Sequence, residues 1–162
     1  MNPVIFLDID GVVVTPRSLA EGGPKHADSS CVANLNRLIE AAQADVVISS
    51  SWRTAHSIDF IRETLCASGF SWPERIIGMT EHMHYRVEHG SIVGRAERSD
   101  EIRAWLEGHP REQFVILDDD LEAEIAGHFI RTEPDWGLRV QELEAALRIL
   151  KQIADGPERG AR

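Results

Sequence analysis

The sequence predicts an α/β domain built around a parallel sheet. Three short apolar runs are the main indication, at residues 4–7, 46–48 and 114–117. Runs of this length without polar alternation are typical of strands that are covered on both faces. Segments with helical spacing of apolar residues lie between them, and strands that alternate with helices form parallel sheets with right-handed crossovers.

Length and composition fit one domain. A chain of 162 residues can bury a sizeable core, and 43% hydrophobic with 27% charged residues is ordinary for a soluble globular protein. We expect a single domain over residues 1–155 and a frayed tail over residues 156–162. The two cysteines, Cys31 and Cys66, are too few for a disulfide framework or a zinc site, and we expect both to be reduced core residues.

The net charge of −10 disfavours a broad nucleic-acid surface, which needs a basic stripe. It does not exclude a local basic site that binds one terminal phosphate. The chain begins directly with a strand, has no secretory leader pattern, and contains no apolar run long enough to span a membrane. We therefore expect a cytoplasmic protein that does not bind membranes.

The elements follow from local signals. Prolines and glycines predict a loop over residues 15–28, and Asp28, Ser29 and Ser30 are candidate caps for a helix that extends to residue 43. A second helix is expected over residues 55–67, ended by Gly69.

The second half of the chain continues this alternation. A short strand over residues 75–80 precedes an irregular segment, 81–97. Ser99 is the expected cap of the next helix, and acidic residues follow in its first turn. Strands at residues 114–117 and 128–132 and an amphipathic helix over residues 140–153 complete the pattern.

Two acids, Asp8 and Asp10, follow the first apolar run and precede Gly11. Residues two apart on an extended segment point to the same side, and paired carboxylates repel each other unless a cation neutralises them. Such a pair at a strand end indicates metal binding or acid–base and nucleophilic chemistry. Taken alone, it is also compatible with two solvated aspartates that cap a loop.

Other polar residues lie just after the remaining strands. Ser49, Ser50 and Ser51 follow the second run and three acids, Asp118, Asp119 and Asp120, follow the third, while Arg95 and Arg98 precede a helix. Ligands bind at the carboxyl ends of strands in open α/β sheets. Acids, hydroxyls and a base are therefore expected at one edge of the sheet.

This order of motifs resembles the haloacid dehalogenase (HAD) superfamily of phosphohydrolases. The segments 48–53, 77–80, 100–106 and 137–138 resemble more closely the small bacterial HAD domains that are related to those fused in RNA-repair proteins. The resemblance implies a HAD-like Rossmannoid, three-layer α/β/α fold with strand order 5-4-1-2-3. The segments 12–45 and 81–97 are too short for a large cap domain.

The resemblance also implies roles for the acids. Asp8 is the expected nucleophile, which forms an aspartyl-phosphate, and Asp10 is the expected general acid and base. Mg²⁺ is expected between the Asp8 carboxylate, the Asp10 backbone carbonyl and Asp119, with Asp118 supporting these ligands. Because three acids are consecutive, the sequence does not show which of them faces the metal, and Asp120 is an alternative ligand. The three acids are also compatible with a solvated turn.

Ser49 is expected to donate a hydrogen bond to a phosphoryl oxygen, and Ser50 is a second candidate for this role. Ser51 is a candidate cap of the next helix. Arg98 is the expected basic residue, with Arg95 as the alternative, although the family usually has lysine there. Arg53 is interpreted either as a substrate contact or as a member of a surface ion pair.

A loop with His82, His84 and His89 has three interpretations: a polar loop, a part of the substrate entrance or a zinc site. The tryptophans are expected to serve packing. Trp105 belongs to the core by its helical spacing, and Trp52 is also a candidate for the rim of the pocket.

The sequence thus predicts a Mg²⁺-dependent phosphatase that acts on a phosphomonoester. An open site favours large substrates, and the RNA-repair resemblance favours a nucleic-acid or nucleotide terminal phosphate; the negative charge favours a small metabolite or a phosphoprotein. The alternatives are a phospho-acceptor signalling domain and a non-catalytic binding module on the same type of sheet. The sequence does not determine the oligomeric state.

Overall fold

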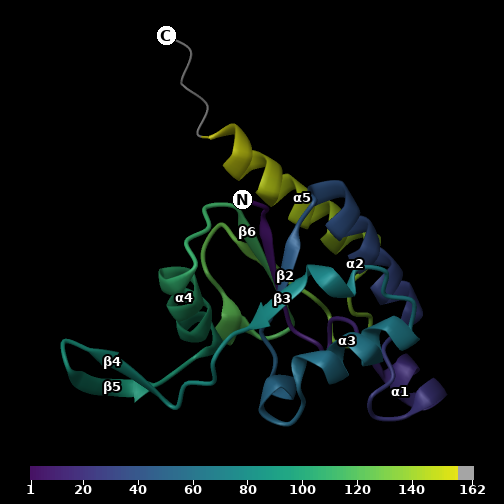
Figure 1. Cartoon of the computed structure of the whole chain (residues 1–162), viewed down its shortest axis with the longest axis horizontal. Helices are drawn as coiled ribbons and strands as arrows, with labels where there is room; N and C mark the ends of the chain where they lie inside the picture. Colours follow the sequence, from purple (N-terminus) through teal and green to yellow (C-terminus); the bar gives the residue numbers. More distant parts are fainter. Residues whose placement is uncertain (157–162) are drawn as a thin grey trace.

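The computed structural model of the chain describes residues 1–156, and a five-stranded parallel sheet lies at its centre (Figure 1). The strands are β1 (Val4–Leu7), β2 (Asp45–Ile48), β3 (Ile76–Met79), β6 (Phe114–Asp118) and β7 (Phe129–Arg131). They are arranged in the order β3-β2-β1-β6-β7, which is the expected order 5-4-1-2-3 when these strands alone are counted. Except for Gly156, the expected frayed tail lies outside the described residues.

Helices cover both faces of the sheet, so the expected three-layer architecture is confirmed (Figure 1). The helices α2 (Ser29–Ala42), α3 (Ile58–Ala67) and α5 (Val140–Asp155) lie on one face, and α4 (Arg98–Gly108) lies on the other. Alternating side chains of each strand supply the two cores. On β1, Ile5 and Leu7 pack toward the three helices, and Val4 and Phe6 pack toward α4.

The smaller core is organised around Phe6. Its ring makes edge-to-face contacts with Trp105 of α4 at 5.4 Å and with Phe114 of β6 at 5.8 Å between ring centroids. Aromatic pairs favour this geometry. The packing fixes α4, and hence Arg98 at its start, against the central strands.

Two expectations about the first connections are wrong. The segment 15–28 contains a helix, α1 (Pro16–Gly22), because Thr15 caps it in a reciprocal box with Ser18 and because proline is favoured at the first helical position. The helix expected from residue 55 begins only at Ile58, after its cap Ser57. A short 3-10 helix, Ser51–Thr54, precedes it and is capped by Ser50, so Ser51 caps neither.

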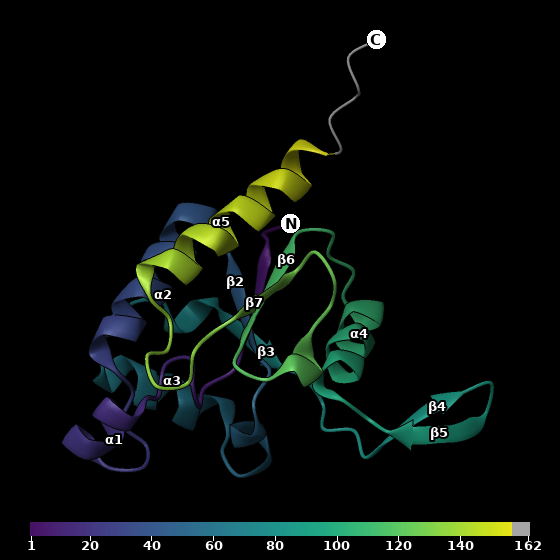
Figure 2. The same cartoon turned by 180° about the vertical axis from the view of Figure 1, so that it is seen from behind.

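The segment 81–97 is not irregular but contains a β-hairpin. Strands β4 (Tyr85–Glu88) and β5 (Ser91–Arg95) pair antiparallel and project away from the sheet (Figures 1 and 2). His89 and Gly90 form the turn, with φ of 51° and 79°. The hairpin ends at Arg95, shortly before α4 begins at Arg98. The base of the hairpin therefore lies beside the carboxyl edge of the sheet.

Smaller expectations are corrected as well. Glu97 rather than Ser99 caps α4, in a box with Asp100. Cys31 is buried as expected, but Cys66 is exposed on α3. No helix within residues 1–156 is both long and apolar enough to span a bilayer.

Candidate active site

Asp8 is positioned by the end of β1. Its backbone N–H donates to Leu117 O at 3.0 Å, which continues the sheet by one residue and buries the side chain. The chain then folds back in a tight loop, in which the N–H groups of Val12, Val13 and Val14 all point to Ile9 O at 3.0–3.2 Å. This loop turns the backbone away from the sheet immediately after the acid.

Gly11 lets this loop approach Asp119. It has a φ of 80°, and a Cβ atom there would lie 2.6 Å from Asp119 Oδ2. Any other residue would both strain the backbone and displace the carboxylate. Thr132 also holds the loop in place, because its hydroxyl donates to Gly11 O at 2.8 Å.

Three carboxylates meet at this edge of the sheet. Oxygen atoms of Asp8, Asp118 and Asp119 lie within 4.8 Å of one another, and we call this group the acidic cluster. The structure places Asp118 within the cluster itself rather than behind it. Asp120 is exposed and accepts a hydrogen bond from Glu122 N, so it lies outside the cluster.

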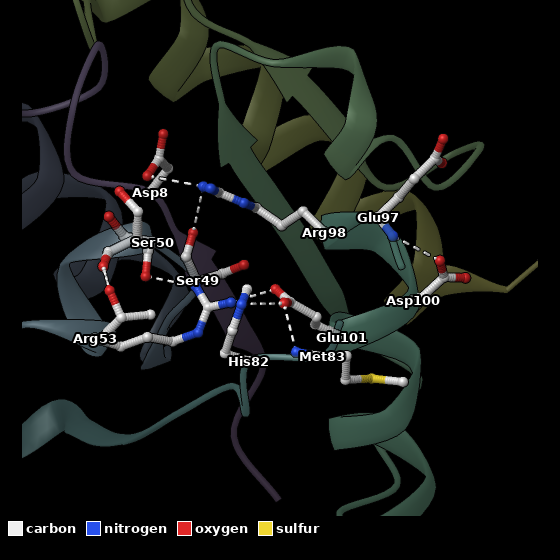
Figure 3. Close-up of polar contacts among 12 residues, drawn as sticks. Asp8, Ser49, Ser50, Arg53, His82, Met83, Glu97, Arg98, Asp100 and Glu101 are labelled. Atoms are coloured by element: carbon white, nitrogen blue, oxygen red, sulfur yellow. Dashed lines mark hydrogen bonds and ion pairs between the residues drawn. The ribbon is translucent and has the colours of Figure 1, made fainter. Parts of the chain in front are cut away.

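Arg98 supplies positive charge to the cluster. Its Nη1 lies 3.0 Å from Asp8 Oδ1 and 3.2 Å from Asp118 Oδ2, and it donates to Ser49 O at 3.0 Å (Figure 3). The expected basic residue therefore contacts the expected nucleophile. The alternative, Arg95, is exposed on β5 and makes no ion pair with the cluster.

The positive charge of Arg98 does not offset the effect of burial on the pKa values of these acids. Burial raises the pKa of Asp8 well above its ordinary value, the neighbouring charge of Asp118 raises it further, and Arg98 opposes both effects. Burial likewise raises the pKa of Asp118 to about 6. Oxygen ligands with excess negative charge suit a hard divalent cation such as Mg²⁺, so the cluster fits one.

The two serines after β2 serve different neighbours. The Ser50 hydroxyl hydrogen-bonds the Asp8 carboxylate and lowers its pKa, and it also accepts from Trp52 N at 3.3 Å. Ser49 contacts Arg98 through its backbone carbonyl, and its buried hydroxyl has no partner among the described residues. Both serines are buried, with exposed fractions of 1% for Ser49 and 0% for Ser50, and Figure 3 shows Ser50 beside Asp8.

Asp10 lies outside the acidic cluster and is exposed. The indole N–H of Trp52 donates to Asp10 Oδ2 at 3.0 Å and restrains the orientation of this carboxylate. Trp52 itself is 8% exposed. Sequence reasoning placed Trp52 in packing or at a pocket rim; its position directly after the serines was the available signal.

Arg53 and Glu101 form a buried ion pair, whereas a surface pair or a substrate contact was expected. Their side chains are 5% and 6% exposed. Glu101 also accepts the Met83 N–H at 3.0 Å and contacts His82 Nδ1 at 3.2 Å (Figure 3). The pair joins the chain after β2 to α4 and to the base of the hairpin, a role for Glu101 that sequence reasoning missed.

The histidine-rich loop does not form a metal cluster. Within residues 1–156, the acidic cluster is the one group of three or more side chains placed to hold a metal. His82 and His84 instead pack edge to face at 4.7 Å, and both line a cavity beside the cluster.

Comparison with protein families identifies the fold. Residues 4–143 match the family described as the HAD domain in Swiss Army Knife RNA repair proteins. The chain belongs to the HAD family. The match includes the acidic cluster, both serines, Arg98 and Trp52, and the family suggests a phosphohydrolase-type function. Neither the curated proteins nor the solved structures contain a match to this chain.

Asp118→Asn should stabilise the protein in the presence of chelator at pH 8. Because the pKa of Asp118 is raised to about 6, the folded state binds its proton more tightly than the unfolded state. The ionised group therefore costs folding free energy above that pKa, by about 3 kcal/mol. The gain should be complete above pH 6 and disappear below pH 4 in urea titrations.

Asp120→Asn is the matched control, because Asp120 is exposed and asparagine also caps a helix. It leaves the acidic cluster intact, so it should not reproduce the stabilisation of Asp118→Asn at pH 8. An Asp118→Asn protein that is less stable than wild type at pH 8 would contradict the electrostatic description of the cluster.

Proposed function

We propose that the protein is a Mg²⁺-dependent phosphohydrolase that cleaves phosphomonoesters through an aspartyl-phosphate on Asp8. The acidic cluster carries this proposal: a buried carboxylate lies within 4.8 Å of two others and is contacted by a guanidinium. Membership of the HAD family supports the same chemistry.

The side chains that would hold Mg²⁺ are Asp8 and Asp119, with Asp118 beside them and the Asp10 backbone carbonyl as a further ligand. Their oxygen chemistry and excess negative charge fit this cation. When bound, Mg²⁺ supplies the positive charge that lets a phosphate dianion approach the carboxylates.

The chain's own groups account for two chemical steps. In the first, an Asp8 carboxylate oxygen bonds to phosphorus while the ester oxygen leaves and takes a proton from Asp10. In the second, Asp10 takes a proton from water, whose oxygen bonds to phosphorus and releases phosphate and the Asp8 carboxylate. Arg98 and Ser50 lie beside Asp8, where they can donate to phosphoryl oxygens.

Trp52 positions the acid–base residue. Its indole N–H donates a hydrogen bond to Asp10 Oδ2, so Oδ1 of the same carboxylate remains available for proton transfer. The exposure of Asp10 suits a group that must exchange protons with substrate and water in turn.

The substrate we propose first is a nucleotide or a nucleic-acid end with a terminal phosphate. The matched family occurs in RNA repair proteins, and no cap domain covers the acidic cluster within the described residues. The net charge of −10 favours small phosphorylated metabolites or a phosphoprotein instead. A screen that includes all these classes distinguishes them.

Activity should require Mg²⁺ and Asp8. We expect hydrolysis of 4-nitrophenyl phosphate with Mg²⁺, loss of the rate in excess EDTA, and no turnover by a folded Asp8→Asn protein. Absorbance of nitrophenolate measures the rate, and circular dichroism controls for folding. Full turnover in EDTA would refute the metal requirement, and near-normal turnover by Asp8→Asn would refute the nucleophile.

Asp10→Asn should separate the two steps. With poor leaving groups the rate should fall by about 10²–10⁴-fold, because the proton donor is lost. Nitrophenolate needs little protonation, so a burst of one equivalent per site should precede slow turnover limited by hydrolysis of the aspartyl-phosphate. Equal losses with both kinds of leaving group, without a burst, would assign Asp10 a structural role only.

A further inference from the structure

A cavity of about 710 Å³ lies directly beside the acidic cluster. Its walls come from the 3-10 helix Ser51–Thr54, the segment that leads into the hairpin, the end of β5 and the first turn of α4. Arg98 belongs to both places, because it lines the cavity and contacts Asp8. The volume is that of a small-molecule site and exceeds the needs of one phosphoryl group.

The charge of this cavity is opposite to that of the whole protein. Three arginines and two histidines line it, namely Arg53, Arg95, Arg98, His82 and His84, although the chain carries a net charge of −10. Of the two acids in its wall, Glu101 is engaged by Arg53 and His82, and Glu122 is exposed. Arg53 is paired with Glu101 and Arg98 with the acidic cluster, so the positive charge left for an anionic ligand is that of Arg95.

One cationic side chain in the cavity wall is not engaged. Arg95 makes no ion pair or side-chain hydrogen bond within residues 1–156, so its guanidinium is available. Arg53 is 5% exposed, and its two terminal nitrogens contact Ser50 O and Glu101 (Figure 3). Its buried Nε, however, has no acceptor among the described residues. Because this Nε is shielded from the cavity, Arg53 shapes the wall, and Arg95 is the arginine that a bound anion can reach.

The arrangement of the donors favours phosphate over carboxylate. A carboxylate is planar and suits one bidentate guanidinium, whereas the oxygens of phosphate point in several directions. Here the donors come from separate segments: His82 and His84 before the hairpin, Arg95 at the end of β5, and Arg98 at the start of α4.

We propose that this cavity binds a second phosphate group of the substrate while the scissile phosphoryl group lies at Asp8. The proposal rests on the proposed function and narrows its substrate class to compounds with two neighbouring phosphates. A nucleoside bisphosphate and a terminal phosphate followed by a phosphodiester share this chemistry.

The kinetic test compares adenosine 3′-phosphate, adenosine 3′,5′-bisphosphate and a 3′-phosphorylated dinucleotide. We expect wild type to favour the substrates with two phosphates by at least about tenfold in kcat/KM, as one charge-assisted hydrogen bond implies. Arg95→Gln should reduce this ratio to within about threefold, mainly through KM.

Arg86→Gln is the matched control, because Arg86 lies on the same hairpin but outside the cavity. It should keep the wild-type ratio. A ratio near one in wild type, or an unchanged ratio in Arg95→Gln, would overturn the proposal. A preference for the dinucleotide over the bisphosphate assigns the second phosphate to a nucleic-acid backbone, and the reverse assigns it to a small molecule.

A binding measurement separates this proposal from the catalytic one. Calorimetry with the Asp8→Asn protein compares the two adenosine compounds without turnover, and the Asp8→Asn, Arg95→Gln protein should lose the preference for the bisphosphate. If this preference is found but wild type does not hydrolyse 4-nitrophenyl phosphate, the cavity assignment stands and the phosphatase proposal fails. If hydrolysis occurs but neither measurement discriminates, only the cavity assignment fails.

Discussion

The burial of several carboxylates close together is the constraint on which this edge of the sheet depends. Asp8 follows β1 and Asp118 ends the neighbouring strand β6. The two acids share the Arg98 guanidinium and nevertheless have raised pKa values, because the effect of burial exceeds that of the attraction. Acids held in this way destabilise the fold unless a cation or a proton neutralises them. The surrounding contacts keep them together: Gly11 makes room for Asp119, and Thr132 holds the loop that carries Gly11.

The acidic cluster adjoins a basic cavity, and Arg98 connects them. This juxtaposition suits a substrate whose phosphate is attacked at one place while the rest of its negative charge is bound at the other. The Arg53–Glu101 pair holds the two halves of the wall together from β2 and α4. Removing one partner of such a buried pair leaves an uncompensated charge, so we regard the pair as a structural element of the cavity.

Local signals were sufficient for the strands of the central sheet, most helices and the acids at strand ends, because apolar runs and caps act over a few residues, but they did not reveal the hairpin of β4 and β5. They failed at α1, where Pro16 was taken as a loop signal although it begins a helix. They could not reveal contacts between distant residues: Trp52 is 42 positions from Asp10, and Arg53 is 48 from Glu101. The sequence also could not show which of the three consecutive acids enter the cluster, because this depends on β6 ending at Asp118.

Trapping of the phosphoenzyme tests the central claim most directly. The Asp10→Asn protein, mixed with a substrate whose phosphoryl group carries ³²P and quenched in acid within one turnover, should retain label on the chain. Borohydride reduction of an aspartyl-phosphate yields homoserine, and peptide mass spectrometry should find it at position 8 and at no other aspartate. A full single turnover with unlabelled protein, or homoserine at another position, would contradict nucleophilic catalysis by Asp8.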